Sequence, residues 1–178
     1  MSHRQSPIVN RQFEAVTASV EETHALGEQL GRLLQPGDVV ALRGELGSGK
    51  TTLIQGIAKG LGCDPHRVKS PTFVLMREYS GPAPVVHIDG YRLSGAPAAA
   101  WLDVDLMFSP SKITLIEWAE RFEGVLPSDH VEISLAHVST NRRRITFRGT
   151  GARGQAVMSQ FQVPGSRFQV VAKAEPET

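Results

Sequence analysis

The chain has 178 residues, of which 40% are hydrophobic and 21% are charged, and its formal net charge is +1. These values suit one folded domain with its own core, and so small a net charge gives no bulk attraction to nucleic acid. Cys63 is the only cysteine, which excludes an internal disulfide and a metal site built from cysteines. Because no apolar run reaches membrane-spanning length and residues 1–10 lack the apolar centre of a signal peptide, we expect a cytoplasmic protein without a membrane partner.

The first predicted helix follows a polar start, residues 1–11, that we expect to be loose. Ser19 and Glu22 have the spacing of a capping box, in which the serine caps the helix and the glutamate reaches back. The helix has one apolar face and ends before a Gln-Pro-Gly turn. Residues 38–43 then predict a short buried strand, and residues 51–61 predict a second helix from the spacing of their apolar side chains.

A phosphate-binding loop connects this strand to the second helix. Residues 44–52 read GELGSGKTT, which fills every fixed position of the pattern G-x-x-x-x-G-K-[ST]. Glycines let consecutive N–H groups turn toward a phosphate, and the helix N-terminus adds a favourable partial charge. We expect Lys50 to reach the outer phosphates of a nucleoside triphosphate and the Thr51 hydroxyl to bind Mg²⁺. The candidate nucleotide-binding residues of the loop are Gly44, Glu45, Leu46, Gly47, Ser48, Gly49, Lys50, Thr51 and Thr52.

Past the second helix, short apolar runs alternate with turns that are rich in glycine and proline. Strands are expected at residues 70–79, 85–89 and 112–117, and a helix is expected at residues 98–108. This alternation of strands and helices favours an α/β domain built on a largely parallel sheet.

The end of the chain differs, because strands follow one another there. Residues 131–138 and 143–147 predict an antiparallel pair, and residues 157–163 predict one more edge strand. We therefore predict an α/β, three-layer P-loop NTPase fold with a mostly parallel sheet and added antiparallel strands. Residues 1–149 are assigned to the P-loop ATPase domain, and residues 150–178 to a C-terminal extension that ends in a disordered tail.

Two acids at strand ends are candidates to complete the site. Asp89 ends one predicted strand and Glu117 ends another, so both are expected at the carboxyl edge of the sheet, beside the loop. Phosphoryl chemistry uses such an acid to hold or orient Mg²⁺ between phosphates. Spacing alone leaves open which acid takes the metal and which positions water, and a strand-end acid can also simply cap the next turn.

Four further features have both a functional and a structural interpretation. The Ser-Pro-Thr-Phe segment around Thr72 could sense a nucleotide or form a plain proline turn. Trp118 could stack on a ligand or partner, although packing in the core is favoured. His87 is expected on the other face of its strand from its apolar neighbours, toward solvent, and a metal role is not expected without a second ligand nearby. The arginines at 142–144 could contact phosphate, an acidic partner or RNA, or could protect an edge strand by their charge.

Four segments occur in a specific order along the chain: GELGSGKTT at 44–52, SPTFVLMREY at 70–79, HIDGYRL at 87–93 and IEWAER at 116–121. Together they resemble the TsaE family, the small bacterial ATPases of tRNA threonylcarbamoyladenosine biosynthesis. The resemblance extends over roughly residues 19–147.

The resemblance implies which residues carry the chemistry. Thr51 and Glu117 would hold Mg²⁺, with ATP as the substrate. Asp89 would be the acid that orients water or acts as a switch. Lys50, Asp89 and Glu117 therefore form the implied catalytic set.

The resemblance also implies contacts farther from the reacting phosphate. Thr23 would lie near the adenine, and Arg142 would approach the nucleotide from the late hairpin. Thr72, Tyr91 and Trp118 would belong to segments that sense the nucleotide or contact a partner.

Homologues of TsaB and TsaD are the implied partners, and tRNA would be reached only indirectly, through their complex. ATP hydrolysis would reset that complex between rounds of modification, and it would be slow in the isolated chain. A small-molecule kinase is the first alternative, although the stretch 94–100 lacks the arginine of a kinase lid. A non-catalytic nucleotide-binding adaptor is the second. A GTPase is not expected, because neither asparagine lies in an Asn-Lys-x-Asp motif.

Overall fold

Seven strands form one sheet in the part of the chain that the computed structural model describes, residues 12–93 and 103–161. The strands are β1 (Gln12–Thr17), β2 (Val39–Gly44), β3 (Met76–Tyr79), β4 (Val85–Asp89), β5 (Ile113–Glu117), β6 (His130–His137) and β7 (Arg143–Thr150). Their order across the sheet is β1-β7-β6-β2-β5-β4-β3. The four central strands β6, β2, β5 and β4 are parallel, and β3, β7 and β1 are added antiparallel to their neighbours.

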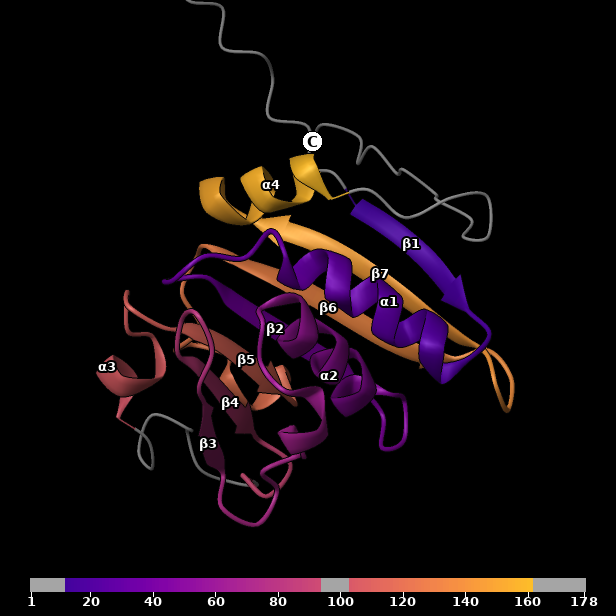
Figure 1. The fold of residues 1–178 in the computed structure, drawn as a ribbon, viewed down its shortest axis with the longest axis horizontal. Helices are drawn as coiled ribbons and strands as arrows, with labels where there is room; N and C mark the ends of the chain where they lie inside the picture. Colours follow the sequence, from indigo (N-terminus) through magenta and orange to yellow (C-terminus); the bar gives the residue numbers. More distant parts are fainter. Residues whose placement is uncertain (1–11, 94–102, 162–178) are drawn as a thin grey trace, which may run out of the picture.

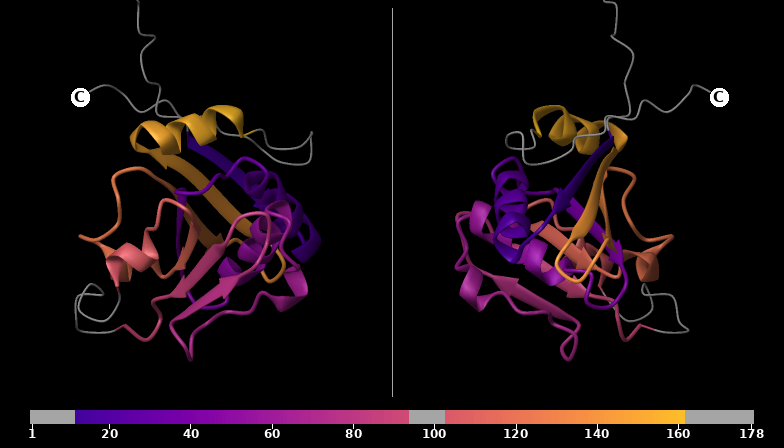
Figure 2. Two further views of the ribbon diagram at one scale, coloured as in Figure 1. Left: turned by 60° about the vertical axis from the view of Figure 1, so that its left-hand side comes forward. Right: turned by 90° about the vertical axis from the view of Figure 1, so that its right-hand side faces the viewer.

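Helices cover the two faces of the sheet unequally (Figure 1). The helices are α1 (Val20–Gly31), α2 (Lys50–Gly60), α3 (Val104–Met107) and α4 (Gly151–Gln160), with the 3₁₀ turns η1 (Pro65–Arg67) and η3 (Ala119–Phe122). Buried side chains of α1, α2 and α4 share one core cluster, whereas α3 and η3 close a smaller core on the other face. The side views in Figure 2 show the sheet between α1 and α3. The predicted α/β fold with a mostly parallel sheet is confirmed, and its third layer is thin.

The capping box at the start of α1 is present. The Ser19 side chain accepts a hydrogen bond from the Glu22 N–H at 3.2 Å, and the Glu22 carboxylate accepts one from the Ala18 N–H at 2.7 Å. The glutamate thus reaches one residue beyond the cap itself. Two backbone donors that the helix cannot satisfy are paired in this way.

Helices α1 and α2 approach each other closely through glycines. A Cβ atom at Gly27 would overlap the Leu53 carbonyl oxygen of α2 and lie 2.9 Å from the Ile57 nitrogen. Because both obstacles are backbone atoms, a side chain at this position cannot be accommodated by a rotamer change. We expect Gly27→Val to lower the free energy of unfolding by about 1–3 kcal/mol or more, the usual cost of overpacking.

Urea unfolding monitored by circular dichroism measures this change. Ala25→Val is the matched control, because it also introduces a valine, at an exposed position of the same helix. Equal losses in the two variants would mean that helix propensity, and not the close approach of α1 and α2, sets the effect.

Two predicted elements are shorter in the structure. The strand expected over residues 70–79 begins only at Met76, because the chain turns at Pro71, whose carbonyl accepts from the Leu75 N–H at 2.7 Å. Leu75 itself has φ 64°, which no strand residue adopts. Of the helix expected over 98–108, residues 98–102 lie outside the described part, and α3 covers only four residues of the remainder.

The predicted edge strand at 157–163 is wrong, because residues 157–160 belong to α4 and residues 162–163 lie outside the described part. Arg153 of α4 donates twice to the carboxylate of Asp38, each bond 2.7 Å long, which ties the helix to the start of β2. The strand at this edge of the sheet is β1, which the sequence analysis did not find. The residues that α4 buries, Gly154, Val157 and Met158, together with Phe161 directly after it, have helical spacing that should have indicated a helix.

Candidate functional site

The phosphate loop ends at the N-terminus of α2, where Gly49 is the cap residue. Gly49 has φ 100°, a left-handed conformation that a residue with a side chain adopts only with strain. Since no side chain caps this helix, the first backbone N–H groups of α2 are available to an anion. The predicted loop therefore has the backbone geometry that binds phosphate.

Lys50 lies folded across the loop. Its ammonium donates to the carbonyls of Gly44 at 2.7 Å and Glu45 at 2.9 Å, and it lies 4.0 Å from the centre of the Trp118 ring. An ammonium has three N–H donors, so one remains for a phosphate oxygen. Burial lowers the pKa of Lys50, and the nearby carboxylates of Glu117, Glu120 and Asp89 oppose that shift. The Lys50 ammonium is thus a buried cation at the loop, next to the position where an anion would bind.

This lowered pKa predicts a pH dependence of stability. The unfolded state binds the Lys50 proton more tightly than the folded state. The free energy of unfolding therefore increases with pH between the lowered pKa of Lys50 in the folded chain and the ordinary pKa of a lysine. We expect Lys50→Met to remove that gain, so the stability of the variant relative to the wild-type protein is greatest near neutral pH and declines in alkali. Urea unfolding of both proteins at several pH values measures the difference, and parallel curves would contradict it.

Thr51 and Glu117 meet directly. The Thr51 hydroxyl donates to the Glu117 carboxylate, 2.8 Å from Oε1 and 3.1 Å from Oε2. Thr51 comes from the first turn of α2 and Glu117 from the end of β5, which lies next to β2 in the sheet. A hydroxyl and a carboxylate oxygen are the hard ligands that Mg²⁺ prefers, with phosphate oxygens completing its shell.

Asp89 organises the segment that precedes β3. Its Oδ2 accepts hydrogen bonds from the hydroxyls of Ser70 and Thr72, the latter at 2.5 Å, and its Oδ1 accepts from the Tyr91 N–H at 2.9 Å. Asp89 pairs with Glu117 in the parallel register of β4 and β5, so the two acids end their strands side by side. The expectation that both acids lie at the loop edge of the sheet is met, and Asp89 is the acid bonded to the Ser-Pro-Thr segment.

Trp118 belongs to the site, and the sequence-based preference for a core position is wrong. Its ring lies beneath Lys50 and 5.2 Å from the ring of Tyr91. The backbone of Trp118 is left-handed, with φ 58°, which turns the chain sharply after Glu117. The buried core on that side is filled by Phe122 and Ala119 of η3.

One cavity of about 490 Å³ brings most of the predicted residues together. The fully buried Ser48 lies in its wall, and the Ser48 hydroxyl has no hydrogen-bond partner among the described residues. Glu45 contributes only its carbonyl, as a partner of Lys50. The cavity is lined by Leu46, Gly47, Ser48, Gly49, Lys50, Thr51, Thr52, Ser70, Thr72, Asp89, Tyr91, Glu117 and Trp118.

A second cavity, of about 370 Å³, lies on the other side of the loop, and Gly47, Gly49 and Thr52 line both. Thr23 lines this cavity, and the Thr23 hydroxyl donates to the Ser19 carbonyl at 3.0 Å. The late hairpin contributes Arg143 to its lining. Arg142, which was the predicted arginine, is exposed at the hairpin turn, where its backbone pairs with Val138 and Ser139.

His87 is the residue that the sequence analysis misjudged most. The ring was expected to face solvent, but its side chain is completely buried, with Nε2 3.0 Å from Glu117 Oε1 and Nδ1 3.2 Å from the Tyr79 hydroxyl. Alternation along β4 did not predict this, because β3 and β5 flank that strand and both faces of the sheet are covered. The HIDGYRL segment contained the signal, since a histidine two residues before a strand-end acid shares its face of the strand.

In the described ranges, no helix has both the length and the apolar character needed to cross a membrane.

A family model, related sequences and a solved structure all match most of this chain. The family model "Threonylcarbamoyl adenosine biosynthesis protein TsaE" matches residues 17–145. A "tRNA threonylcarbamoyladenosine biosynthesis protein TsaE" of Bacillus subtilis is 37% identical over 152 residues, which cover 85% of this chain and 94% of that protein. A protein of the same name from Streptomyces coelicolor is 41% identical over 137 residues, covering 72% and 90%. The crystal structure of Bacillus subtilis YdiB matches with a TM-score of 0.71 at 31% identity, covering 85% of this chain and 95% of that one.

Proposed function

Because this chain belongs to the TsaE family of tRNA threonylcarbamoyladenosine biosynthesis, we propose that it is a magnesium-dependent P-loop ATPase supporting that modification. The observation that carries the proposal is the convergence of three groups at the N-terminus of α2. They are the Lys50 ammonium, the Thr51 hydroxyl and the Glu117 carboxylate, all on the wall of one cavity. These are the parts that phosphoryl chemistry requires beside an open set of backbone N–H groups.

The loop binds and orients the phosphates in this proposal. The free N–H groups of α2 and the remaining N–H of Lys50 donate to phosphate oxygens, and the unpartnered Ser48 hydroxyl offers one more donor. Thr51 and Glu117 would hold Mg²⁺, because the threonine oxygen keeps lone pairs for the ion while its O–H proton points to the carboxylate. The bound ion supplies positive charge that offsets the charge developing on the phosphate oxygens.

Asp89 acts on the attacking water in this proposal, either by orienting it or by accepting its proton. The same carboxylate holds the hydroxyls of Ser70 and Thr72 and the backbone of Tyr91. A change at the reacting phosphate that moves Asp89 would therefore move both neighbouring segments. Thr72, Tyr91 and Trp118 are accordingly proposed as residues that pass the nucleotide state to a partner.

The smaller cavity is proposed to receive the nucleoside part of ATP, because the loop glycines separate it from the metal side. Thr23 contributes to its wall mainly through shape, since its hydroxyl is already bonded inside the protein. Arg143 takes the place that the family resemblance implied for Arg142, because it is the arginine that lines this cavity.

Homologues of TsaB and TsaD are the proposed partners, with tRNA contacted indirectly through them in the cytoplasm. Large apolar side chains are exposed around the mouth of the site, which supports docking of a protein there. The most exposed are Phe73, at 83%, and Leu46, at 71%. ATP hydrolysis in this chain is proposed to reset the partner complex between rounds of modification.

ATP hydrolysis by the purified chain, alone and with TsaB, TsaD and tRNA, tests this function while modified tRNA is measured in parallel. We expect the partners to change turnover, and repeated tRNA modification to require the chain with Lys50 intact. Lys50→Ala is expected to be inactive, and Lys59→Ala on the same helix is its matched control, because Lys59 is exposed and pairs with Glu28. Binding of ATP without release of phosphate under all conditions would indicate an adaptor, and phosphate transfer to a small acceptor would indicate a kinase.

A further inference from the structure

A buried chain of hydrogen bonds leads from Glu117 across β4 to the edge strand β3. Glu117 Oε1 lies 3.0 Å from His87 Nε2, His87 Nδ1 lies 3.2 Å from the Tyr79 hydroxyl, and that hydroxyl lies 3.0 Å from the Lys69 carbonyl oxygen. His87, Glu117 and Tyr79 are all buried, with exposures of 0%, 3% and 7%. Thr51 lies at the other end of this chain of hydrogen bonds, because its hydroxyl donates to the Glu117 carboxylate.

The direction of donation along this chain follows from the groups themselves. A carboxylate only accepts, so His87 Nε2 carries a proton and donates to Glu117. The Nε2–H tautomer leaves Nδ1 as an acceptor, 3.2 Å from the Tyr79 hydroxyl, whose single proton also has the Lys69 carbonyl oxygen within reach at 3.0 Å. Burial raises the pKa of Tyr79, so the hydroxyl keeps the proton that it donates. Each group is thus held in one orientation by the next.

This arrangement has a consequence for the carboxylate. Oε1 accepts from both Thr51 and His87, whereas Oε2 accepts only from Thr51, at the longer distance. The imidazole therefore anchors one oxygen and leaves the other with free lone pairs at the N-terminus of α2. Without the hydrogen bond from His87, the Glu117 side chain could rotate about its terminal bonds, and its free oxygen would no longer point to the same position as the Thr51 hydroxyl oxygen.

We propose that His87 is a positioning residue, braced by Tyr79, that orients the Glu117 carboxylate for a divalent cation shared with Thr51. The inference rests on the proposed function and assigns a role to two residues outside the cavity that holds the nucleotide site. Partners that orient the ligands of a metal in this way change metal affinity by about 10–100-fold when they are removed.

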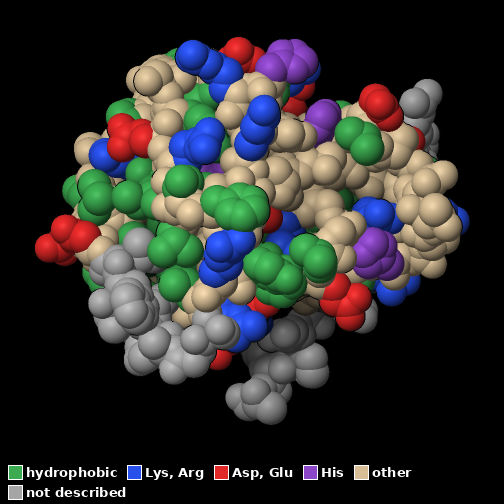
Figure 3. Space-filling model, turned by 90° about the horizontal axis from the view of Figure 1, so that it is seen from below, with side chains coloured by type: hydrophobic (Ala, Val, Ile, Leu, Met, Phe, Trp, Pro, Cys, Tyr) green, Lys and Arg blue, Asp and Glu red, His purple; other side chains and the backbone are tan. Residues whose placement is uncertain are grey.

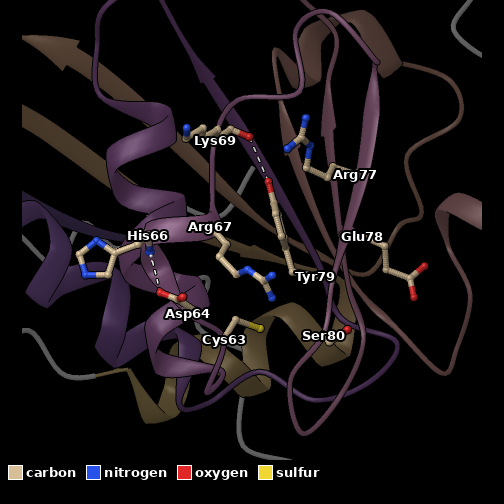
Figure 4. A pocket seen from close by; sticks show the side chains of 9 residues that line it. All are labelled: Cys63, Asp64, His66, Arg67, Lys69, Arg77, Glu78, Tyr79 and Ser80. Carbon is tan, nitrogen blue, oxygen red and sulfur yellow. Dashed lines mark hydrogen bonds between the residues drawn. The ribbon is translucent and has the colours of Figure 1, made fainter.

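Tyr79, which supports the His87 ring, belongs to the edge strand β3. It lines a separate cavity of about 620 Å³ between η1 and β3, together with Cys63, Arg67 and Arg77. In Figure 4 its ring extends across this cavity and its hydroxyl meets the Lys69 carbonyl. Because the Tyr79 hydroxyl acts on Glu117 only through the imidazole, its removal should have a smaller effect than removal of the imidazole.

The test compares His87→Leu, His87→Gln and Tyr79→Phe with the wild-type chain. Binding of a fluorescent ATP analogue is measured in EDTA and then across a series of Mg²⁺ concentrations. We expect His87→Leu to bind the nucleotide normally in EDTA but to need about 10-fold more Mg²⁺ or more for half-maximal effect. His87→Gln restores most of the Mg²⁺ affinity, because its amide N–H can replace Nε2–H, and Tyr79→Phe falls between His87→Leu and the wild-type chain.

His24→Leu is the matched control, since it removes another histidine Nε2 hydrogen bond, to Gln55 at 3.1 Å, away from the site. The ¹⁵N chemical shifts of the His87 ring give a readout that needs no metal, and they are expected to show the Nε2–H tautomer. An Nδ1–H tautomer, or equal Mg²⁺ requirements in His87→Leu and the wild-type chain, would overturn the positioning role. Loss of EDTA binding in both His87 variants would also overturn it, because His87 would then support the nucleotide site as a whole and not the Mg²⁺ ligand. A wild-type chain whose nucleotide binding ignores Mg²⁺ would overturn the proposed magnesium chemistry, and the positioning role with it.

Discussion

Glu117→Gln is expected to lower ATP hydrolysis about 100-fold or more, because the cation loses its only charged protein ligand in the proposed site. The fold should remain intact for a specific reason. A glutamine oxygen in the place of Oε1 still accepts from Thr51 and His87, so neither donor is left buried without a partner. Phosphate release at saturating ATP and Mg²⁺, with nucleotide binding in EDTA as the reference, measures the effect.

Glu123→Gln is the control for this experiment, because Glu123 is exposed and its ion pair with Arg43 lies at the surface. Its hydrolysis should equal that of the wild-type chain. Wild-type turnover in Glu117→Gln would contradict a metal role for Glu117. Loss of nucleotide binding in EDTA would instead indicate that the carboxylate supports the loop structurally.

Asp89→Asn is expected to lower hydrolysis by a similar factor, about 100-fold, while nucleotide affinity changes little. The asparagine oxygen can still accept from the Tyr91 N–H, and its amide can donate to the hydroxyl oxygens of Ser70 and Thr72. The local hydrogen bonds are therefore retained while the negative charge is lost. Single-turnover hydrolysis separates this loss at the chemical step from any change in product release.

Asp105→Asn, an exposed acid on α3, controls for the change in net charge. If Asp89→Asn hydrolyses ATP normally, the charge of Asp89 has no part in the reaction and its role is to hold the two neighbouring segments. If nucleotide affinity falls together with hydrolysis, the residue acts through the shape of the site and not through its charge.

The phosphate loop could be predicted from sequence because its geometry is local. Consecutive residues supply the positive-φ glycine, the exposed N–H groups and Lys50, and the structure has each of them in place. The strand-end acids could be predicted for a related reason, since parallel strands with a loop at their carboxyl edge bring their last residues together. Asp89 and Glu117 do lie at that edge.

Other features depended on neighbours that are distant in the chain. Trp118 was expected in the core, but a left-handed turn directs it to Lys50. His87 was expected in solvent, but β3 and the covered faces of the sheet enclose it. Arg143 and not Arg142 lines the second cavity, because β7 begins at Arg143 whereas Arg142 lies in the exposed hairpin turn.

The phosphate loop, the succession of the main strands along the chain and the family could all be predicted from sequence, because each rests on residues close together or on motifs in a specific order. The direct hydrogen bond between Thr51 and Glu117, and the contacts that join Glu117 to His87 and His87 to Tyr79, emerged only from the folded chain. The physical reason is that a side chain's partners follow from the order and register of the strands. The packing of the whole sheet sets that order and register, and no single segment of the sequence contains enough information to predict them.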